Sequence, residues 1–179
     1  MKLLDFYKYL DKLKRTKRAG WVKAGIPDSE SVSDHSFSTS VLSMILADKL
    51  EVNKEKFIKM ALIHELGESI IGDVVWHSQA KGTNEAVLAK KEKDEGKAMR
   101  KILKTLEDKE YLDLWIEMEE KKTREAIMHK EIDRLDVAFQ AFFNEKRTGV
   151  NLDVFFEFAE KFTRDKEIKK ILKKIKTSR

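Results

Sequence analysis

The chain has no cysteine, one proline and only seven glycines among its 179 residues. Without thiols it forms no disulfide and has no cysteine nucleophile, which fits a reducing compartment such as the cytoplasm. Folds rich in β-structure need many turn residues, so the scarcity of proline and glycine favours helices joined by short loops. A chain of this length is expected to form one domain with a sizeable core.

Long apolar runs and a strong excess of one charge are also absent. No segment approaches the ~18 apolar residues of a membrane-spanning helix, and residues 1–5 lack the apolar stretch of a signal peptide. We therefore expect a cytoplasmic protein without a membrane partner. The net charge of +5 comes from 37 basic and 32 acidic residues. The basic stretches, residues 12–18 and 166–179, lack interleaved aromatics and are typical of solvated helix ends, not of a site for a nucleic acid polymer.

Apolar residues at helical spacing predict a series of helices. They cover about 2–14, 33–50, 54–64, 84–106, 111–118, 123–146, 151–163 and 165–176. Ser31 or Ser33 is suited to cap the second helix, and Asn53 the third. Residues 15–32 and 74–83 are expected to be loops. Because no repeat and no linker is visible, the sequence predicts an all-α, single-domain helical bundle.

Histidine is scarce, with only His35, His64, His77 and His129. A single histidine is more often a surface or core residue than a ligand. His64 differs because it lies in an apolar stripe and is followed at once by Glu65. We expect this pair to lie on a helix, where burying it without a partner is costly. Imidazole and carboxylate together suit zinc, manganese, cobalt or iron better than calcium.

Asp133 has a similar setting, between apolar neighbours on a predicted helix. Charged residues also flank it, so a surface ion-pair cluster is the alternative. From the residues alone, a metal site built from histidine and carboxylate is therefore a hypothesis. The residues after His64 do not match the His-Glu-x-x-His motif of zinc proteases.

Together, His35, the pair His64-Glu65 and Asp133 resemble the H…HD…D pattern of the HD-domain phosphohydrolases. The flanking segments resemble the branch of that family that contains 5′-deoxynucleotidases. These segments are residues 15–22, 30–36, 61–73 and 130–136, the last together with residues 140–141. The resemblance covers about residues 1–147, which we interpret as the HD-domain core. Residues 148–179 are expected to form helices that pack on this domain or extend it.

The resemblance implies that His35, His64 and Asp133 bind one divalent metal ion, with Glu65 in the fourth ligand position. The family has aspartate where this chain has Glu65. Glutamate has the same charge and donor atoms, but its carboxylate reaches ~1.5 Å further, against metal–oxygen bonds of ~2.0–2.2 Å. The affinity and the identity of the metal, whether Mn, Co, Zn, Fe, Ni or Mg, therefore stay open.

The resemblance also implies residues that act on the substrate. Glu68 and Asp73 would be catalytic carboxylates, Arg18 would contact the phosphate, and Trp21 would lie near the sugar or the phosphate. Arginine suits phosphate because its planar fork donates two hydrogen bonds. Considered singly, the four have alternative interpretations: an exposed helix acid, a turn or cap residue, a surface charge and a core residue. Asp136 lies on a neighbouring helix face and is a candidate to orient a metal ligand.

The implied function is a metal-dependent phosphomonoesterase that converts 5′-deoxynucleoside monophosphates to deoxynucleoside and phosphate. One alternative is a phosphohydrolase that acts on another small phosphate ester or on a nucleoside triphosphate. The other is a degenerate HD module that binds nucleotide only, which the glutamate at position 65 supports and the complete set of implied catalytic residues opposes. The expected partners are a small nucleotide and a second copy of the chain. Phe155, Phe156 and Phe158 are candidates for that interface or for the core.

Overall fold

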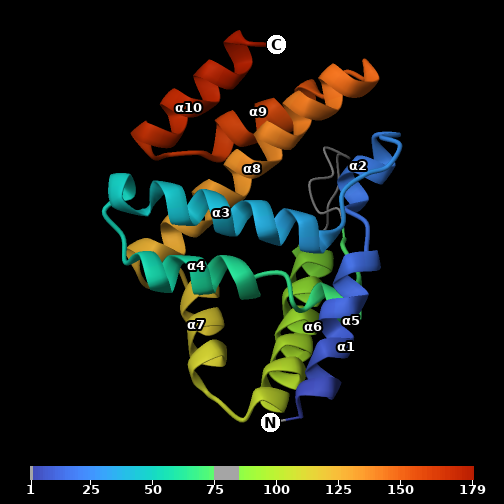
Figure 1. Ribbon diagram of the computed structural model, residues 1–179, viewed down its shortest axis with the longest axis vertical. Helices are drawn as coiled ribbons and strands as arrows, with labels where there is room; N and C mark the ends of the chain where they lie inside the picture. The colour runs from blue at the N-terminus through green and yellow to red at the C-terminus, as the bar shows by residue number, and fades with distance from the viewer. Residues whose placement is uncertain (1, 75–84) are drawn as a thin grey trace.

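The structure is a computed structural model that describes residues 2–74 and 85–179. Within these ranges there is no β-strand, and one isolated antiparallel bridge joins Lys17 to Ser31. The helices shown in Figure 1 are α1 (Leu3–Arg15), α2 (Ala19–Lys23), α3 (Val32–Leu50), α4 (Lys54–Ile63), α5 (Glu68–Ile71), α6 (Glu85–Leu103), the 3-10 helix η1 (Lys104–Leu106), α7 (Glu110–Glu119), α8 (Arg124–Thr148), α9 (Asp153–Phe162) and α10 (Lys166–Thr177). The all-α prediction is confirmed. None of the described helices combines the length and the apolarity that crossing a bilayer requires.

Side-chain caps fix where the helices that carry the site begin. Ser31 caps α3 through a capping box: its hydroxyl accepts from the Asp34 amide, and the Asp34 carboxylate accepts from the Ser31 amide at 2.7 Å. Asn53 caps α4 and Thr123 caps α8: each side-chain oxygen accepts a hydrogen bond from a backbone amide in the first turn of its helix. Because α3 begins at Val32, His35 lies in its first turn.

One predicted loop contains a helix. Residues 15–32 include the short helix α2, Ala19–Lys23. Its first amide, that of Ala19, donates to the Asp73 carboxylate at 2.7 Å, so the cap comes from a distant segment. Five residues are too few to show helical periodicity, and a cap from 54 positions away leaves no local signal.

The prediction that the His64-Glu65 pair lies on a helix is wrong. Helix α4 ends at Ile63, and residues 64–67 form tight turns in which the Leu66 amide donates to the Ile63 carbonyl at 3.1 Å. Gly67 lies against α6, where a Cβ atom would meet Glu95 Cγ at 3.2 Å. Close packing on α6 thus favours the tighter i to i+3 winding over a continued α-helix.

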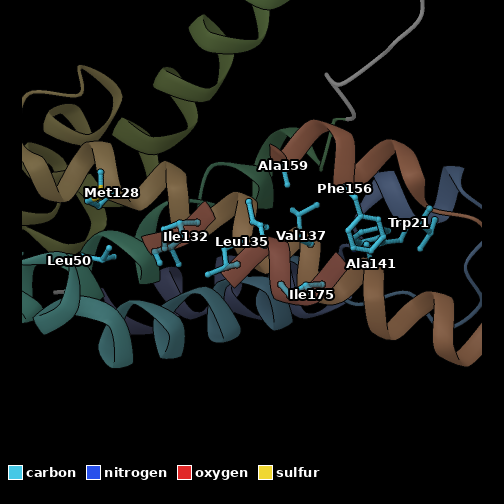
Figure 2. Close-up of a cluster of buried hydrophobic side chains, with 14 of the residues drawn as sticks. Trp21, Leu50, Met128, Ile132, Leu135, Val137, Ala141, Phe156, Ala159 and Ile175 are labelled. Carbon is cyan, nitrogen blue, oxygen red and sulfur yellow. The ribbon is translucent and has the colours of Figure 1, made fainter. Parts of the chain in front are cut away.

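Two clusters of apolar side chains form the core. One joins α3, α8, α9 and α10, and Figure 2 shows it extending from Leu50 and Met128 to Trp21 and Phe156. The other joins α1, α4, α6 and α7. Helix α8, with 25 residues the longest, crosses behind α3 and α4 in Figure 1 and contributes to both clusters. The polar residues described next lie where the two clusters meet.

The last two helices pack on α8 within the first cluster. Phe156 is 4 % exposed there, so it is a core residue and does not form an interface. Arg179 holds this end of the chain: its guanidinium contacts Glu145 at 2.7 Å and Asp153 at 2.6 Å. It also stacks on the Phe156 ring at 4.1 Å.

Candidate metal centre and active site

Four predicted metal ligands converge from three parts of the chain. His35 comes from the first turn of α3, His64 and Glu65 from the turn after α4, and Asp133 from the middle of α8. His35 Nε2 lies 3.4 Å from His64 Nε2 and 3.2 Å from Asp133 Oδ1. Glu65 Oε1 lies 3.5 Å from His64 Nε2 and 3.9 Å from His35 Nε2.

These separations fit one metal ion. Two ligand atoms that are each about 2.1 Å from an ion and subtend a tetrahedral angle lie about 3.4 Å apart. The donor atoms of His35, His64 and Glu65 lie 3.4, 3.5 and 3.9 Å apart, whereas Asp133 lies 3.2 Å from His35 but outside the group whose donor atoms are all within 4.8 Å of one another. Two imidazoles with two carboxylates form a donor set that first-row divalent metals accept. By the chemistry and the spacing of its donors, the cluster therefore suits a divalent metal ion.

Hydrogen bonds outside the cluster orient both imidazoles. His35 Nδ1 donates to Asp136 Oδ2 at 2.7 Å, and His64 Nδ1 donates to the Ala61 carbonyl at 2.7 Å. Each bond leaves Nε2 of the ring to face the centre. Such supporting bonds fix the ring orientation and raise ligand basicity. The geometry thus gives Asp136 the orienting position that its helix face predicted.

The pKa shifts in the cluster follow from burial and close pairing. Burial alone would lower the pKa of His35, but hydrogen bonds to Asp133 and Asp136 outweigh it and raise the pKa to about 10. Burial lowers the pKa of His64 to about 4. Burial would raise the pKa values of Glu65 and Asp133, yet the nearby histidines lower both well below the usual range. The two carboxylates are therefore ionised at neutral pH, which is the state that a metal ligand needs.

Arg18 adds a permanent positive charge beside this cluster. Its Nη1 donates to Glu65 Oε1 at 3.1 Å and lies 3.7 Å from Asp73 Oδ2. Burial opposes a charge, but Glu65 and Asp73 raise the pKa of Arg18 above its ordinary value. Its neighbour in the basic run, Arg15, pairs with Asp11 on the surface instead. Of the two arginines in this run, Arg18 is thus the one whose side chain faces the cluster.

The remaining predicted residues also lie at this centre. Glu68, in α5, is 2 % exposed, so it is not an exposed helix acid. Trp21 is 2 % exposed, and its Nε1 donates to Glu30 Oε1 at 2.8 Å. Asp73 caps α2 through Ala19, as described above. Trp21 and Asp73 therefore hold the segment that carries Arg18 in place.

A cavity of about 370 Å³ opens over the cluster. Its lining includes seven of the eight predicted site residues: Arg18, Trp21, His64, Glu65, Glu68, Asp73 and Asp133. The eighth, His35, is fully buried. A concave site of this size with convergent charged groups is typical of a small-molecule binding site.

Comparison with known proteins identifies the family. The family model described as "HD domain" matches residues 10–176. This chain belongs to the HD-domain family. The resemblance seen in the sequence is thereby confirmed.

Among curated relatives, this HD-domain protein is 38% identical over 171 residues to "5'-deoxynucleotidase HDDC2" of Dictyostelium discoideum, covering 86% of each chain. It is 36% identical over 182 residues to the protein of the same name from Danio rerio, covering 99% of this chain and 88% of that one. The "5'-deoxynucleotidase hdd1" of Schizosaccharomyces pombe is 31% identical, with coverages of 86% and 78%.

Solved structures share the fold. A conserved hypothetical protein from Pyrococcus furiosus is 31% identical with a TM-score of 0.78, covering 97% of this chain and 99% of that one. The PH0347 protein from Pyrococcus horikoshii OT3 is 30% identical with a TM-score of 0.79, covering 96% and 97%. A predicted metal-dependent phosphohydrolase from Magnetospirillum magnetotacticum, 24% identical with a TM-score of 0.70 over 98% and 90% of the chains, shares the fold alone.

The HD-domain protein brings further residues to the centre that the sequence did not assign to it. Lys130 lines the cavity, and its charge helps to lower the pKa of Asp133. Lys130 lies three residues before Asp133, so the sequence already placed the two side chains on the same side of one helix. Phe155, Phe158 and Phe162 of α9 line another part of the cavity. Their spacing places them on one helix face, but helical spacing alone does not distinguish a cavity wall from core.

His129 was interpreted as a structural or surface residue, and it is fully buried. Its ring packs edge-on against His64 with centroids 4.6 Å apart. Neither ring nitrogen has a hydrogen-bond partner in the part of the chain that the structure describes. The remaining histidine, His77, lies outside the described residues.

Proposed function

We propose that this protein is a metal-dependent phosphomonoesterase that hydrolyses 5′-deoxynucleoside monophosphates to deoxynucleoside and phosphate. One observation carries the proposal: a single cavity brings together a metal-binding donor set, a partly buried arginine and a buried carboxylate. The names of the curated relatives, 5'-deoxynucleotidases that match most of this chain, support the substrate class. Hydrolase activity follows from the same relatives and from the HD-domain family.

In this proposal His35, His64 and Asp133 hold the metal, with Glu65 as the fourth ligand. When bound, a divalent ion here supplies a Lewis acid that polarises a phosphoryl oxygen. The candidate ions are manganese, cobalt, zinc, iron, nickel and magnesium. Elemental analysis of the purified protein identifies which of these it contains.

Arg18 binds the substrate phosphate, because its charge persists at every physiological pH and its position beside Glu65 faces the cavity. Glu68 takes a proton from the attacking water while the oxygen of that water bonds to phosphorus. The bond from phosphorus to the 5′ oxygen then breaks, and Glu68 returns the proton to that leaving oxygen. Asp73 serves the reaction by holding the Ala19 amide, and with it the Arg18 segment, at the cavity.

The decisive experiment is phosphate release by the metal-loaded protein from all four deoxynucleoside and all four ribonucleoside monophosphates. We expect turnover of the deoxynucleotides and a fall in kcat of about 10²–10⁴-fold in Glu68→Gln, with KM nearly unchanged. Glu157→Gln, at an exposed position of α9 outside the cavity, is the matched control. No phosphate from any nucleotide, or full activity in Glu68→Gln, would contradict the proposal. Pyrophosphate or triphosphate release from nucleoside triphosphates would assign the alternative chemistry.

We propose also that the enzyme is a cytoplasmic homodimer with no nucleic acid polymer or membrane as partner, and that residues 1–147 and 148–179 form one domain. Exposed apolar side chains on α3 support the proposal of a dimer: Phe37 is 70 % exposed, Met44 48 % and Ile45 63 %. A cluster of large exposed apolar side chains on one helix commonly marks an interface. Sedimentation equilibrium of the protein and of Ile45→Glu tests the assembly: a dimer that dissociates in the variant is expected.

A further inference from the structure

We propose that Lys130 is a second phosphate-binding residue, whose ammonium group donates to the substrate phosphate from the other side of the metal-binding cluster than Arg18. The inference deepens the proposed function and rests on it, because its ligand is the phosphate of the proposed substrate. Neither the relatives' names nor the family assignment gives Lys130 a role.

The side chain of Lys130 faces the cluster from α8. Lys130 lies three residues before Asp133 on this helix, and both line the cavity of about 370 Å³. Burial would lower the pKa of Lys130, but nearby carboxylates outweigh it and raise the pKa, and among them Asp133 contributes most. The lysine is therefore charged at neutral pH and stands next to a proposed metal ligand.

Arg18 and Lys130 approach the cluster from different elements. Arg18, the N-cap residue of α2, donates to Glu65 at 3.1 Å, and Glu65 raises its pKa more than Asp133 does. The order is reversed for Lys130, whose pKa Asp133 raises more than Glu65 does. Each cation is thus nearest to a different proposed ligand of the metal. A phosphate bound over the cluster lies between the two.

The charges at the centre require a second cation. A phosphate monoester carries about two negative charges at neutral pH. The acids of the proposed site are Glu65, Glu68, Asp73 and Asp133. Two of these four offset the charge of a divalent ion, and Arg18 offsets a third. One negative charge would remain and repel the substrate, because like charges in a partly buried site are poorly screened. Lys130 supplies the missing positive charge.

A structural ion pair does not account for Lys130. Its Nζ lies 3.9 Å from Glu119 Oε1, which is beyond hydrogen-bond length, so this contact occupies none of its three N–H donors. The Glu119 side chain is 36 % exposed, and ion pairs open to water contribute little to stability. The Lys130 side chain is itself 33 % exposed, and it lines the cavity. A ligand in the cavity therefore has access to it.

The test is a calorimetric titration of inorganic phosphate into the metal-saturated protein. Lys130→Met removes the charge and keeps an unbranched side chain. We expect it to raise Kd for phosphate by about 10–100-fold, as loss of a charge-assisted hydrogen bond does. Lys130→Arg should restore most of the affinity. Lys121→Met, which removes a charge from an exposed position of the same cavity, is the matched control. At physiological ionic strength it should change Kd by no more than about twofold.

Kinetic constants should show the same selectivity for the charged part of the ligand. In Lys130→Met, KM for deoxyadenosine 5′-monophosphate should rise, whereas the inhibition constant of deoxyadenosine, the uncharged product, should not change. A displaced helix would weaken the binding of both. The comparison therefore separates a phosphate contact from a structural role of Lys130.

Three results would overturn the assignment. One is an equal loss of phosphate affinity in Lys130→Met and Lys121→Met, which would indicate only the general field of the cavity. Another is a loss in Glu119→Gln as large as that in Lys130→Met, which would make the ion pair the cause. The third is weaker metal binding by Lys130→Met in a chelator competition, which would make Lys130 a support for Asp133.

The phosphate titration also separates this inference from the proposed function. If the wild type releases no phosphate from any nucleotide but binds inorganic phosphate more tightly than Lys130→Met does, the function fails and the role of Lys130 stands. If the wild type turns over deoxynucleotides and the two proteins bind phosphate equally, the function stands and the role of Lys130 fails. No binding of phosphate by the wild type would also overturn that role.

Discussion

A single carboxylate oxygen of Glu65 serves two neighbours at once. Oε1 is 3.1 Å from the Arg18 guanidinium and 3.5 Å from His64 Nε2. An aspartate, which the resemblance to the H…HD…D pattern implies at this position, would withdraw the oxygen by ~1.5 Å, against metal–oxygen bonds of ~2.0–2.2 Å. In this chain the longer residue spans the gap between the proposed metal ligands and Arg18, the residue proposed to bind phosphate.

We therefore expect Glu65→Asp to weaken metal binding by about 10–100-fold, as loss of supporting interactions around a metal commonly does. Competition titration with a metallochromic chelator measures the change. Tighter binding in the variant would show instead that the glutamate is a weakened ligand and that the site prefers the shorter acid.

A second prediction at this scale concerns His129. Burial lowers its pKa well below the ordinary value, so the folded protein keeps the ring neutral while the unfolded chain binds a proton near pH 6.5. Stability is thus unaffected by this ring above pH ~6.5 and falls by about 1.4 kcal/mol for each pH unit below it. In His129→Leu this loss should be absent, and urea unfolding at pH 7 and pH 5 measures the difference.

At pH 7 the same variant should be at least as stable as the wild type. The leucine has a similar volume and removes two buried nitrogens that have no hydrogen-bond partner in the described chain. Parallel pH dependences in the two proteins would mean that the His129 ring is protonated in the fold or that a hydrogen bond satisfies it.

The elements were predictable where their signals are local. Periodicity and the predicted caps Ser31 and Asn53 placed the long helices within a few residues. The failures have non-local causes: α2 is capped by Asp73, and the turn at His64 is set by the packing of Gly67 on α6. The sequence offers the phenylalanines of α9 for an interface or for the core, because apolar residues on adjacent helix faces look the same whether they cover a core or a cavity.

Helix α10 is expected to be integral to the fold. Ile168 is fully buried in the cluster that also contains residues of α3 and α8. We expect Ile168→Ala to lower the free energy of unfolding by about 3 kcal/mol, through lost burial and the cavity left behind. Ile171→Ala, at a partly buried position on the same helix, should cost clearly less. Denaturant titration compares the two, and equal small losses would show that α10 is only loosely attached.

The proposed metal ligands come from three distant parts of the chain: α3, the turn after α4, and α8. An ion that binds only the folded state should therefore stabilise the entire chain. At a concentration 100 times Kd the gain is about 2.7 kcal/mol, which for a chain of this size raises Tm by roughly 8 °C. Thermal unfolding with metal and with chelator measures this shift. The same shift in His64→Ala would place the ion elsewhere.

The sequence could name the metal ligands only through resemblance, because nothing local shows that α3 faces α8. The resemblance also supplied the other predicted site residues. Three features depend instead on how the helices pack: the cavity that joins seven of the eight, its wall from α9, and the contact of His129 with His64. Packing of this kind is a property of pairs of distant segments, and single-segment patterns do not contain it.

The hydrogen bond from His35 to Asp136 joins residues that are 101 positions apart. A contact of this range brings a large entropic cost of chain closure, so it forms after local helices are in place. The ligand set is therefore complete only late in folding, and metal has nothing to bind before that point. Its effect should appear in kinetics as slower unfolding at an unchanged folding rate, so that the ion determines how long a folded molecule lasts and not how quickly it is made.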